Sequence, residues 1–285
     1  MVIFPGTRID QLISEDIPYI DLTSIALGIG DTPGRMSYFT REKCTLAGVA
    51  VARQVMAHLD CTVASSRSDG DELEAGETIM EVHGDASALH AAWKVCLNLF
   101  DHLSAVATKT RSMVDAAHAV NPRCEILTTR KSLLGAKDLL TEAVMVGGAF
   151  PHRLGLSETV LVFEHHIAFF GGFDDFLRRI PAIKARCVEK KLFVEAEADR
   201  AAALARAGVD GIQLDKVAPD ELGGLVRELK GLNPGVTLIA AGGVNPQNVG
   251  AYAATGVDGL ATTSPFTAKP IDMSVRIEAA EEESM

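Results

Sequence analysis

The sequence lacks three features that would place the protein in a membrane or on the secretory route. It has no run of about 18 uncharged apolar residues, so we expect no membrane-spanning helix. Residues 1–18 lack the charged and then apolar build of a signal peptide. The five cysteines are scattered, with no CxxC pair or metal-ligand spacing, which is typical of reduced thiols. Together these absences predict a cytoplasmic protein.

The sequence also lacks an excess of positive charge. Its formal net charge is −11, which argues against a nucleic-acid-binding protein, since that function needs a basic surface. A small anion can still bind, because a local cluster of cations sets the field inside a cleft. With 285 residues and 47% hydrophobic content, the chain can bury the core of one large domain or of two modest ones.

The first part of the chain has a mixed pattern. Apolar residues at helical spacing predict a helix at 42–59, and two short strands are expected at 62–64 and 78–82. A turn-rich link at 69–76 separates the two strands. This pattern predicts an α/β layer with a small sheet. Two successive helices, the second ending before Asn121-Pro122, are expected to join this layer to the rest of the chain.

From Arg123 onward, strand-like and helical segments alternate. The expected strands are 124–128, 143–146, 159–163, 192–196, 211–214, 236–241 and 257–262, and the expected helices are 132–142, 173–190, 199–207, 219–232 and 246–255. Repeated β-then-α units imply parallel strands with right-handed crossovers. Seven such strands fit a barrel or a doubly wound sheet. The barrel is favoured, because polar residues follow nearly every strand.

Active sites of β/α barrels lie at the C-terminal ends of the strands. The residues at these ends are Arg130, Lys131, His152, Arg153, Glu164, His165, His166, Glu195, Asp215, Lys216, Gly242, Gly243, Thr263 and Ser264. Cations gathered at one mouth need an anionic partner such as phosphate, pyrophosphate or carboxylate. Glu195 and Asp215 can hold Mg²⁺, directly or through water. The small residues at 241–243 let backbone N–H groups approach a phosphate.

The adjacent histidines His165 and His166 suggest a metal site at first sight. Neighbouring residues on a strand point to opposite faces, however, so both cannot easily bind one ion. We expect one ring to line the mouth and the other to pack.

These motifs resemble those of quinolinate phosphoribosyltransferases, also called nicotinate-nucleotide pyrophosphorylases. The shared segments are Glu15-Asp16, Leu97-Asn98, Ser104–Thr108, Thr129-Arg130-Lys131, His152–Leu156, Val194-Glu195, Leu214-Asp215, Gly242-Gly243 and Gly256–Asp258. The resemblance implies the type II phosphoribosyltransferase fold, an open α/β sandwich followed by a seven-stranded α/β barrel. The sandwich would span 1–112, completed by 270–285, and the barrel 113–269. It further implies a homodimer in which one subunit's sandwich domain covers the partner's barrel mouth.

The activity implied by the resemblance is transfer of phosphoribosyl from PRPP to quinolinate, with Mg²⁺, releasing pyrophosphate and CO₂. In that scheme Lys131, Glu195 and Asp215 are catalytic, and Glu195 and Asp215 hold the metal. Arg130, His152 and Arg153 bind the acid groups of the acceptor. His166, and Lys94 reaching across the dimer, are further substrate-binding candidates. Phosphate would be held by Gly242, Gly243, Thr263 and Ser264.

The chain departs from the family pattern mainly on the acceptor side. Lys94 replaces a family arginine and keeps the charge but not the bidentate geometry. Phe163 replaces a substrate-binding lysine, and 239–241 lack the family's carboxylate and two hydroxyls. The acceptor therefore need not be quinolinate but can be a related heteroaromatic acid. These departures resemble the ModD subgroup, named for its association with molybdenum-transport genes.

Two other functions remain open on the sequence. One is a non-catalytic anion- or metabolite-binding paralogue linked to molybdenum transport, which kept the pocket and lost turnover. The other is an unrelated phosphate-binding barrel enzyme, such as an isomerase of small sugar phosphates. That enzyme would need neither the first domain nor a lysine like Lys94 on its long helix.

Overall fold

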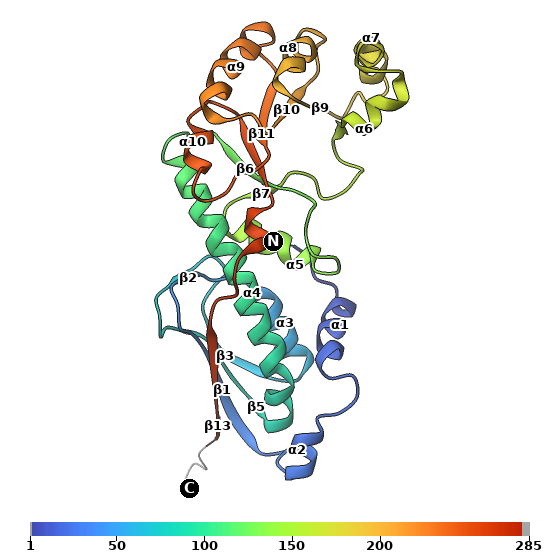
Figure 1. Cartoon of the computed structure of the whole chain (residues 1–285). Helices are drawn as coiled ribbons and strands as arrows, with labels where there is room; N and C mark the ends of the chain where they lie inside the picture. The colour runs from blue at the N-terminus through green and yellow to red at the C-terminus, as the bar shows by residue number, and fades with distance from the viewer. Residues whose placement is uncertain (1, 281–285) are drawn as a thin grey trace. The chain divides into compact units, whose positions relative to one another are not determined.

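The computed structural model describes residues 2–280 and divides into two compact units (Figure 1). The first unit contains Met1–Thr110, Leu133–Gly148 and Thr267–Met285, and the second contains Arg111–Ser132 and Ala149–Phe266. No helix among the described residues is both long enough and apolar enough to cross a membrane.

The first unit is built on a four-stranded antiparallel sheet in the order β13-β1-β5-β3. Its strands are β1 (Pro33–Thr40), β3 (Thr62–Ser66), β5 (Thr78–Asp85) and β13 (Met273–Ala279). Side chains of β1 alternate, with Met36 and Tyr38 fully buried and Arg35 exposed. One face of the sheet is therefore packed and the other is open to solvent, as antiparallel sheets allow.

Helices cover the packed face of this sheet (Figure 1). The unit contains α1 (Gly6–Asp16), α2 (Leu22–Leu27), α3 (Val49–His58), most of α4 (Ala86–His118) and α5 (Lys137–Val146), with β2 (Cys44–Thr45) and β4 (Glu72–Leu73) forming a separate pair. The Tyr38 hydroxyl donates to the backbone oxygens of Ala92 and Trp93 at 3.3 and 3.2 Å. The Tyr38 ring meets Phe100 edge-on at 5.3 Å. These contacts fix α4 against β1.

The sequence predictions for this unit are partly confirmed. Strands β3 and β5 lie where strands were expected, but the helix expected at 42–59 begins only at Val49. Gly48 has φ 100° and interrupts the helix there, and the Asp69 carboxylate caps the new start by accepting the Val49 and Ala50 N–H groups. The two expected joining helices are one helix of 33 residues, α4. Strands β1 and β13 were missed.

The segment before β13 is tied to α4 through Asp101. Ile271 donates its N–H to the Asp101 backbone oxygen at 3.0 Å, and the Met273 N–H bonds the carboxylate. One carboxylate oxygen is buried without a hydrogen-bond partner. Burial raises the pKa of Asp101 from its ordinary 3.8 to about 6. The carboxylate is therefore held in a position that favours its protonated form.

This raised pKa predicts a loss of stability as the pH rises. The folded state binds the Asp101 proton more tightly than the unfolded state does. Protonation of Asp101 therefore adds to the free energy of unfolding in full below about pH 4, and this contribution is lost as the pH rises past about 6. Asp101→Asn keeps an acceptor for Met273 and should gain about 1 kcal/mol over the wild type between pH 4 and 7, allowing for solvent screening. Urea unfolding at each pH measures this, with exposed Asp115→Asn on the same helix as the control. A parallel response of both variants would contradict it.

The second unit is a seven-stranded, fully parallel sheet in the order β7-β6-β12-β11-β10-β9-β8. The strands are β6 (Glu125–Thr128), β7 (Phe150–Pro151), β8 (Val160–Val162), β9 (Leu192–Ala196), β10 (Gly211–Asp215), β11 (Thr237–Ala241) and β12 (Gly259–Thr262). The crossovers carry α6 (Glu164–Ile167), α7 (Phe173–Lys184), α8 (Ala198–Arg206), α9 (Pro219–Leu232) and α10 (Val249–Ala253). This confirms the predicted seven-stranded α/β barrel in a curled form, open between β7 and β8.

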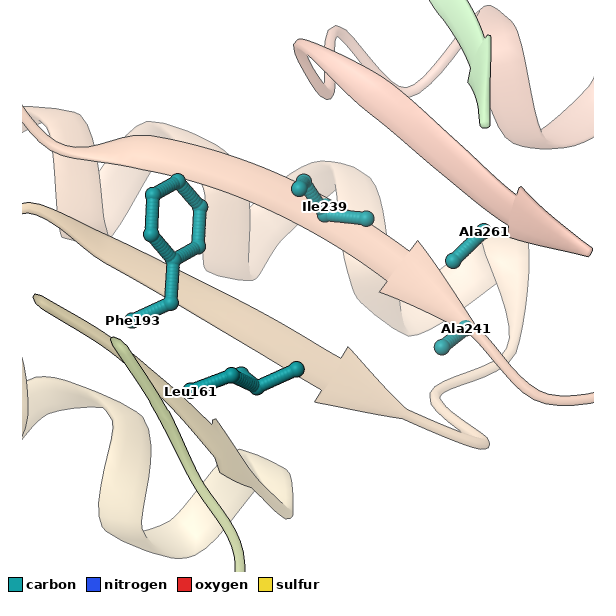
Figure 2. Close-up of a cluster of buried hydrophobic side chains, with 5 residues drawn as sticks. All are labelled: Leu161, Phe193, Ile239, Ala241 and Ala261. Atoms are coloured by element: carbon teal, nitrogen blue, oxygen red, sulfur yellow. The ribbon is translucent and has the colours of Figure 1, made fainter. Parts of the chain in front are cut away.

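The interior of the curled sheet is filled by apolar side chains (Figure 2). The cluster contains Leu161, Phe193, Ile239, Ala241 and Ala261, with Leu127 and Phe163 packed against it. Gly211 lies beside Phe193 in the register of β9 and β10, and a Cβ at Gly211 would come within 2.1 Å of the Phe193 ring. The large ring thus needs a glycine as its neighbour, which is how large and small residues alternate inside barrels.

One expected strand is wrong. Residues 143–146 form the end of α5, and the strand after it is β7, Phe150–Pro151. The short apolar run at 143–146 fits a strand or a buried helix face equally well, so its pattern could not decide. The helix expected at 132–142 accordingly starts at Lys137, and those expected at 173–190 and 246–255 are shorter in the structure.

The α5 segment also belongs to the first unit, although the sequence placed it in the barrel domain. Arg8 forms an ion pair with Asp138 at 2.8 Å. Gly147 lies so close to Thr110 that a Cβ would approach the Thr110 side chain to 2.5 Å. The chain therefore leaves the barrel sheet after β6 and returns to it at β7. Residues 281–285 of the segment expected to complete the first domain lie outside the described residues.

Candidate active site at the carboxyl ends of the parallel strands

The loop after β6 is fastened to the loop after β12. The Thr129 and Thr263 hydroxyls are 2.8 Å apart, and the Thr129 N–H donates to the Thr262 oxygen at 3.0 Å. The Lys131 N–H in turn donates to the Thr129 hydroxyl at 3.2 Å. Two predicted site residues, Lys131 and Thr263, are thus brought to one part of the sheet edge.

The predicted cations converge on the neighbouring strand end. His152 follows β7 and donates its N–H to the Thr128 oxygen at 2.8 Å. Arg153 is buried, at 7% exposure, and donates to the Thr159 oxygen at 3.3 Å. Burial first, and then the charge of Arg130, lower the pKa of Arg153. Arg130 and Arg153 therefore lie close enough to repel one another.

Arg153 has no carboxylate within ion-pair distance among residues 2–280. Its nearby acid Glu158 instead accepts the Leu154 N–H. A buried charge normally has a partner, because an unpaired one is costly. The unpaired guanidinium therefore indicates a site for an anionic ligand.

His152 adds a neutral hydrogen-bonding group beside Arg153. Burial, and next the Arg153 charge, lower the pKa of His152 below its usual 6.5, so the ring is neutral near pH 7. Its Nε2 atom is buried without a hydrogen-bond partner. Buried polar atoms are nearly always satisfied, so this nitrogen is a second position that a ligand can complete.

A pair of carboxylates faces the same interior from β9 and β10. Burial, and then the charge of Asp215, raise the pKa of Glu195, while Gln213, Lys131 and Lys216 oppose the shift. The Lys216 Nζ lies 3.3 Å from Asp215 Oδ2. The pair is therefore close enough for mutual repulsion and is partly compensated by two lysines.

The donor set fits Mg²⁺ better than a softer metal. No group of three or more His, Cys, Asp or Glu side chains among the described residues could hold an ion. Mg²⁺ commonly takes only one or two protein carboxylates and completes its octahedron with water and substrate phosphates. Glu195 and Asp215 supply that number of ligands.

The backbone at the end of β10 packs tightly against the glycine pair after β11. Lys216 has φ 56°, a left-handed conformation, and donates its N–H to the Ala241 oxygen at 2.8 Å. A Cβ on Gly242 would lie 2.7 Å from Lys216 Cγ, 2.9 Å from Lys216 N and 3.0 Å from Asp215 Oδ1. Gly242 therefore sets the position of the Asp215 carboxylate. Gly243 faces open space.

Comparison with known proteins agrees with this geometry. The family model "Quinolinate phosphoribosyl transferase, C-terminal domain" matches residues 106–276, and "Quinolinate phosphoribosyl transferase, N-terminal domain" matches residues 21–104. The chain belongs to the quinolinate phosphoribosyltransferase family. The resemblance drawn from the sequence motifs is confirmed.

Relatives with two different names cover nearly the whole chain. "Putative pyrophosphorylase ModD" of Pasteurella multocida is 33% identical over 98% of this chain and 99% of its own length. "Probable nicotinate-nucleotide pyrophosphorylase [carboxylating]" of Methanothermobacter thermautotrophicus is 34% identical over 94% of this chain and 97% of its own.

Solved structures share the fold along the full chain. The nicotinate-nucleotide pyrophosphorylase from Francisella tularensis has a TM-score of 0.86 at 27% identity, covering 97% of this chain and 98% of that one. NadC from Streptococcus pyogenes has a TM-score of 0.88 at 25% identity, covering 99% and 100%.

The remaining family-derived candidates are less central. His165 and His166 lie in the short helix α6, so the strand geometry expected for them was wrong, while the expectation that one ring lines the mouth stays a prediction. The His166 ring is stacked on Phe163. Its Nδ1 accepts the Phe163 N–H at 2.9 Å. Ser264 donates its N–H to the Thr262 hydroxyl at 3.0 Å. Lys94 is exposed on α4 in the first unit, with its Nζ 5.4 Å from the centre of the Trp93 ring; its role across a dimer stays a prediction.

One residue of this site was not identified from the sequence, and another was identified but given no role. Gln213, at 7% exposure, donates through Nε2 to Glu195 Oε2. Residues two apart in a strand point to the same face of the sheet, so Gln213 shares a face with Asp215. This spacing was the sequence signal that could have identified Gln213. Lys216 appeared only as a strand-end residue. Its positive φ and its ion pair with Asp215 had no sequence signal.

The glycine pair gives a matched test of the packing at Asp215. Gly243→Ala should destabilise the protein by about 1 kcal/mol through its positive φ alone. Gly242→Ala carries a similar strain and the overlap with Lys216 and Asp215 as well, which should add about 1–3 kcal/mol. Urea unfolding of both variants measures the difference. Equal losses would show that Gly242 does not constrain the end of β10.

Proposed function

We propose that this chain is a phosphoribosyltransferase that moves phosphoribosyl from PRPP to quinolinate or a related heteroaromatic acid. The observation that carries the proposal is the unpaired, buried Arg153 beside Arg130. The pair Glu195 and Asp215, with Lys131 near Glu195, supports it from the other side of the site. The names of the relatives, pyrophosphorylases, describe the same type of reaction.

In this reaction a ring nitrogen of the acceptor uses its lone pair to bond C1 of the ribose. The C1–O bond to pyrophosphate breaks, and its electron pair leaves with the pyrophosphate. Positive charge builds on the ribose while negative charge builds on the leaving group. Both changes are stabilised best by charges already in position.

The protein groups divide between these two tasks. Lys131 and the backbone N–H groups at Gly242 and Gly243 bind the diphosphate, and Glu195 and Asp215 face the positive ribose. Glu195 and Asp215 would also hold Mg²⁺, which would supply positive charge to stabilise the leaving pyrophosphate. The acceptor is held and oriented by Arg130, Arg153 and His152. Because the two substrates are then already positioned, their reaction becomes effectively unimolecular. If quinolinate is the acceptor, the product is nicotinate mononucleotide with release of CO₂.

The proposal includes a homodimer and a cytoplasmic location. Lys94, exposed on α4, would reach the partner subunit's acceptor. One observation favours a non-catalytic, anion-binding paralogue linked to molybdenum transport instead: Lys216 already neutralises Asp215, at 3.3 Å. Turnover decides between the two.

The direct test is incubation with PRPP, Mg²⁺ and a panel of heteroaromatic acids, following pyrophosphate release. Lys131→Ala should lower kcat/KM by about 10²–10³, as loss of one charge-stabilising group does. Lys190→Ala, an exposed lysine before β9, is the matched control and should keep full activity. PRPP binding by calorimetry without pyrophosphate release from any acid would favour the binding paralogue.

Gln213 provides a second test within the same scheme. Gln213→Met keeps the side-chain length but removes the donor to Glu195. A hydrogen bond to a charged group contributes about 1.5–3 kcal/mol, so affinity for PRPP with Mg²⁺ should fall by about tenfold or more once Glu195 loses this donor. Calorimetric titration measures the affinity. Unchanged affinity would mean that Glu195 needs no support from Gln213.

A further inference from the structure

The Phe163 ring forms an apolar wall beside the cations of the acceptor side. It directly follows β8, is partly buried, and packs against the apolar cluster inside the sheet. The Arg153 guanidinium lies 6.0 Å from the ring centre. The His166 ring is stacked on Phe163 with centres 5.8 Å apart and planes at 28°. Phe163 therefore orders both Arg153 and His166.

The register of the sheet places this wall next to the reacting groups. Val162 is paired with Val194, so the next residues along the two parallel strands are Phe163 and Glu195. Glu195 is the carboxylate assigned above to the ribose. An acceptor ring that contacts Phe163 thus lies where its nitrogen can meet the sugar.

The buried part of this region carries one positive charge. Arg153 is buried and has no carboxylate partner among the described residues, whereas Arg130 is exposed to solvent. His152 is neutral near pH 7 because burial and Arg153 lower its pKa, and its buried Nε2 has no partner. A second carboxylate would therefore meet the negative face of an aromatic ring, a neutral imidazole, or the exposed Arg130, whose charge is screened by solvent. None of these is as strong a partner for a desolvated anion as the buried Arg153.

We propose that the acceptor is a heteroaromatic acid with a single carboxylate, and that Phe163 is the residue that selects against a dicarboxylate. The carboxylate pairs with Arg153, the ring lies on Phe163, and a polar group of the acceptor bonds His152 Nε2. The ring-nitrogen lone pair forms the bond to C1, and the electron pair of the C1–O bond leaves with pyrophosphate. No carbon–carbon bond breaks, so CO₂ is not released. This inference rests on the proposed function.

The test compares pyridine-3-carboxylate with pyridine-2,3-dicarboxylate on the full chain. Calorimetry with Mg²⁺ and pyrophosphate present gives the two affinities, and turnover with PRPP gives pyrophosphate and labelled CO₂. The monoacid should bind at least tenfold more tightly and yield pyrophosphate without CO₂. Phe163→Lys, which adds a cation beside Arg153, should shift the affinity ratio at least tenfold toward the diacid. Phe163→Leu is the control: it adds no cation, so both acids should bind more weakly and the ratio should shift far less than with Phe163→Lys.

The outcomes separate this inference from the proposed function. Tighter binding of the diacid by the wild type, CO₂ release, or a Phe163→Lys ratio equal to that of the wild type would overturn the inference and leave the transferase intact. Selective monoacid binding without pyrophosphate release would overturn the transferase and support the acceptor assignment. The wild-type ratio alone decides the preference if a variant fails to fold, as judged by circular dichroism.

Discussion

The packing of Phe193 over Gly211 is the constraint on which the second unit depends. The ring fills the centre of the curled sheet together with Leu161 and Ile239, so the interior is apolar below the strand ends. Charged side chains on the same inward face, such as Glu195 and Asp215, can then occur only near the carboxyl ends. This apolar interior lowers the local dielectric. The lower dielectric raises the pKa of Glu195 and strengthens the electrostatic interactions of the charged side chains at the strand ends.

Charged side chains at the two ends of the sheet differ in whether they have partners of opposite charge. At the amino ends, Asp210 pairs with Lys184 and accepts the Leu192 N–H, and Asp258 pairs with Lys230 and accepts the Leu238 N–H. Each acid there is satisfied twice, which is typical of the stabilising face of such barrels. At the carboxyl ends, Arg153 is buried without an acid partner among residues 2–280. In a chain of net charge −11, carboxylates are plentiful, so a shortage of acids does not explain why Arg153 has no acid partner.

The sequence predicted the strand ends well, because the apolar run indicates the buried strand and the polar residue after it indicates the carboxyl end. Strand β9 coincides with its expected range, and Glu195 follows from it. Residues 143–146 were misassigned because four apolar residues carry too little periodicity to separate a helix from a strand. The Lys216 conformation and the Gln213 contact depend on the spacing between β9, β10 and β11, which no local pattern encodes. Strand β13 pairs with a strand more than 230 residues earlier, at Arg35 and Glu278, and so was also missed.

The two sides of the candidate site, one proposed for PRPP and one for the acceptor, differ in how freely their residues can change. On the side proposed to bind PRPP, Asp215 pairs with Lys216 at 3.3 Å, a Cβ on Gly242 would overlap both residues, and the Thr129 and Thr263 hydroxyls join two strand ends. A substitution there disturbs the sheet itself. On the side proposed to bind the acceptor, Phe163 directly follows a three-residue strand at the open edge of the sheet, and its ring lies about 6 Å from the Arg153 guanidinium and from the His166 ring. Side chains at that edge can change without moving a paired strand, because β8 has a neighbour on one side only. In the proposed reaction, transfer would therefore depend on residues that the sheet holds in place, and the choice of acceptor on residues that the sheet leaves free.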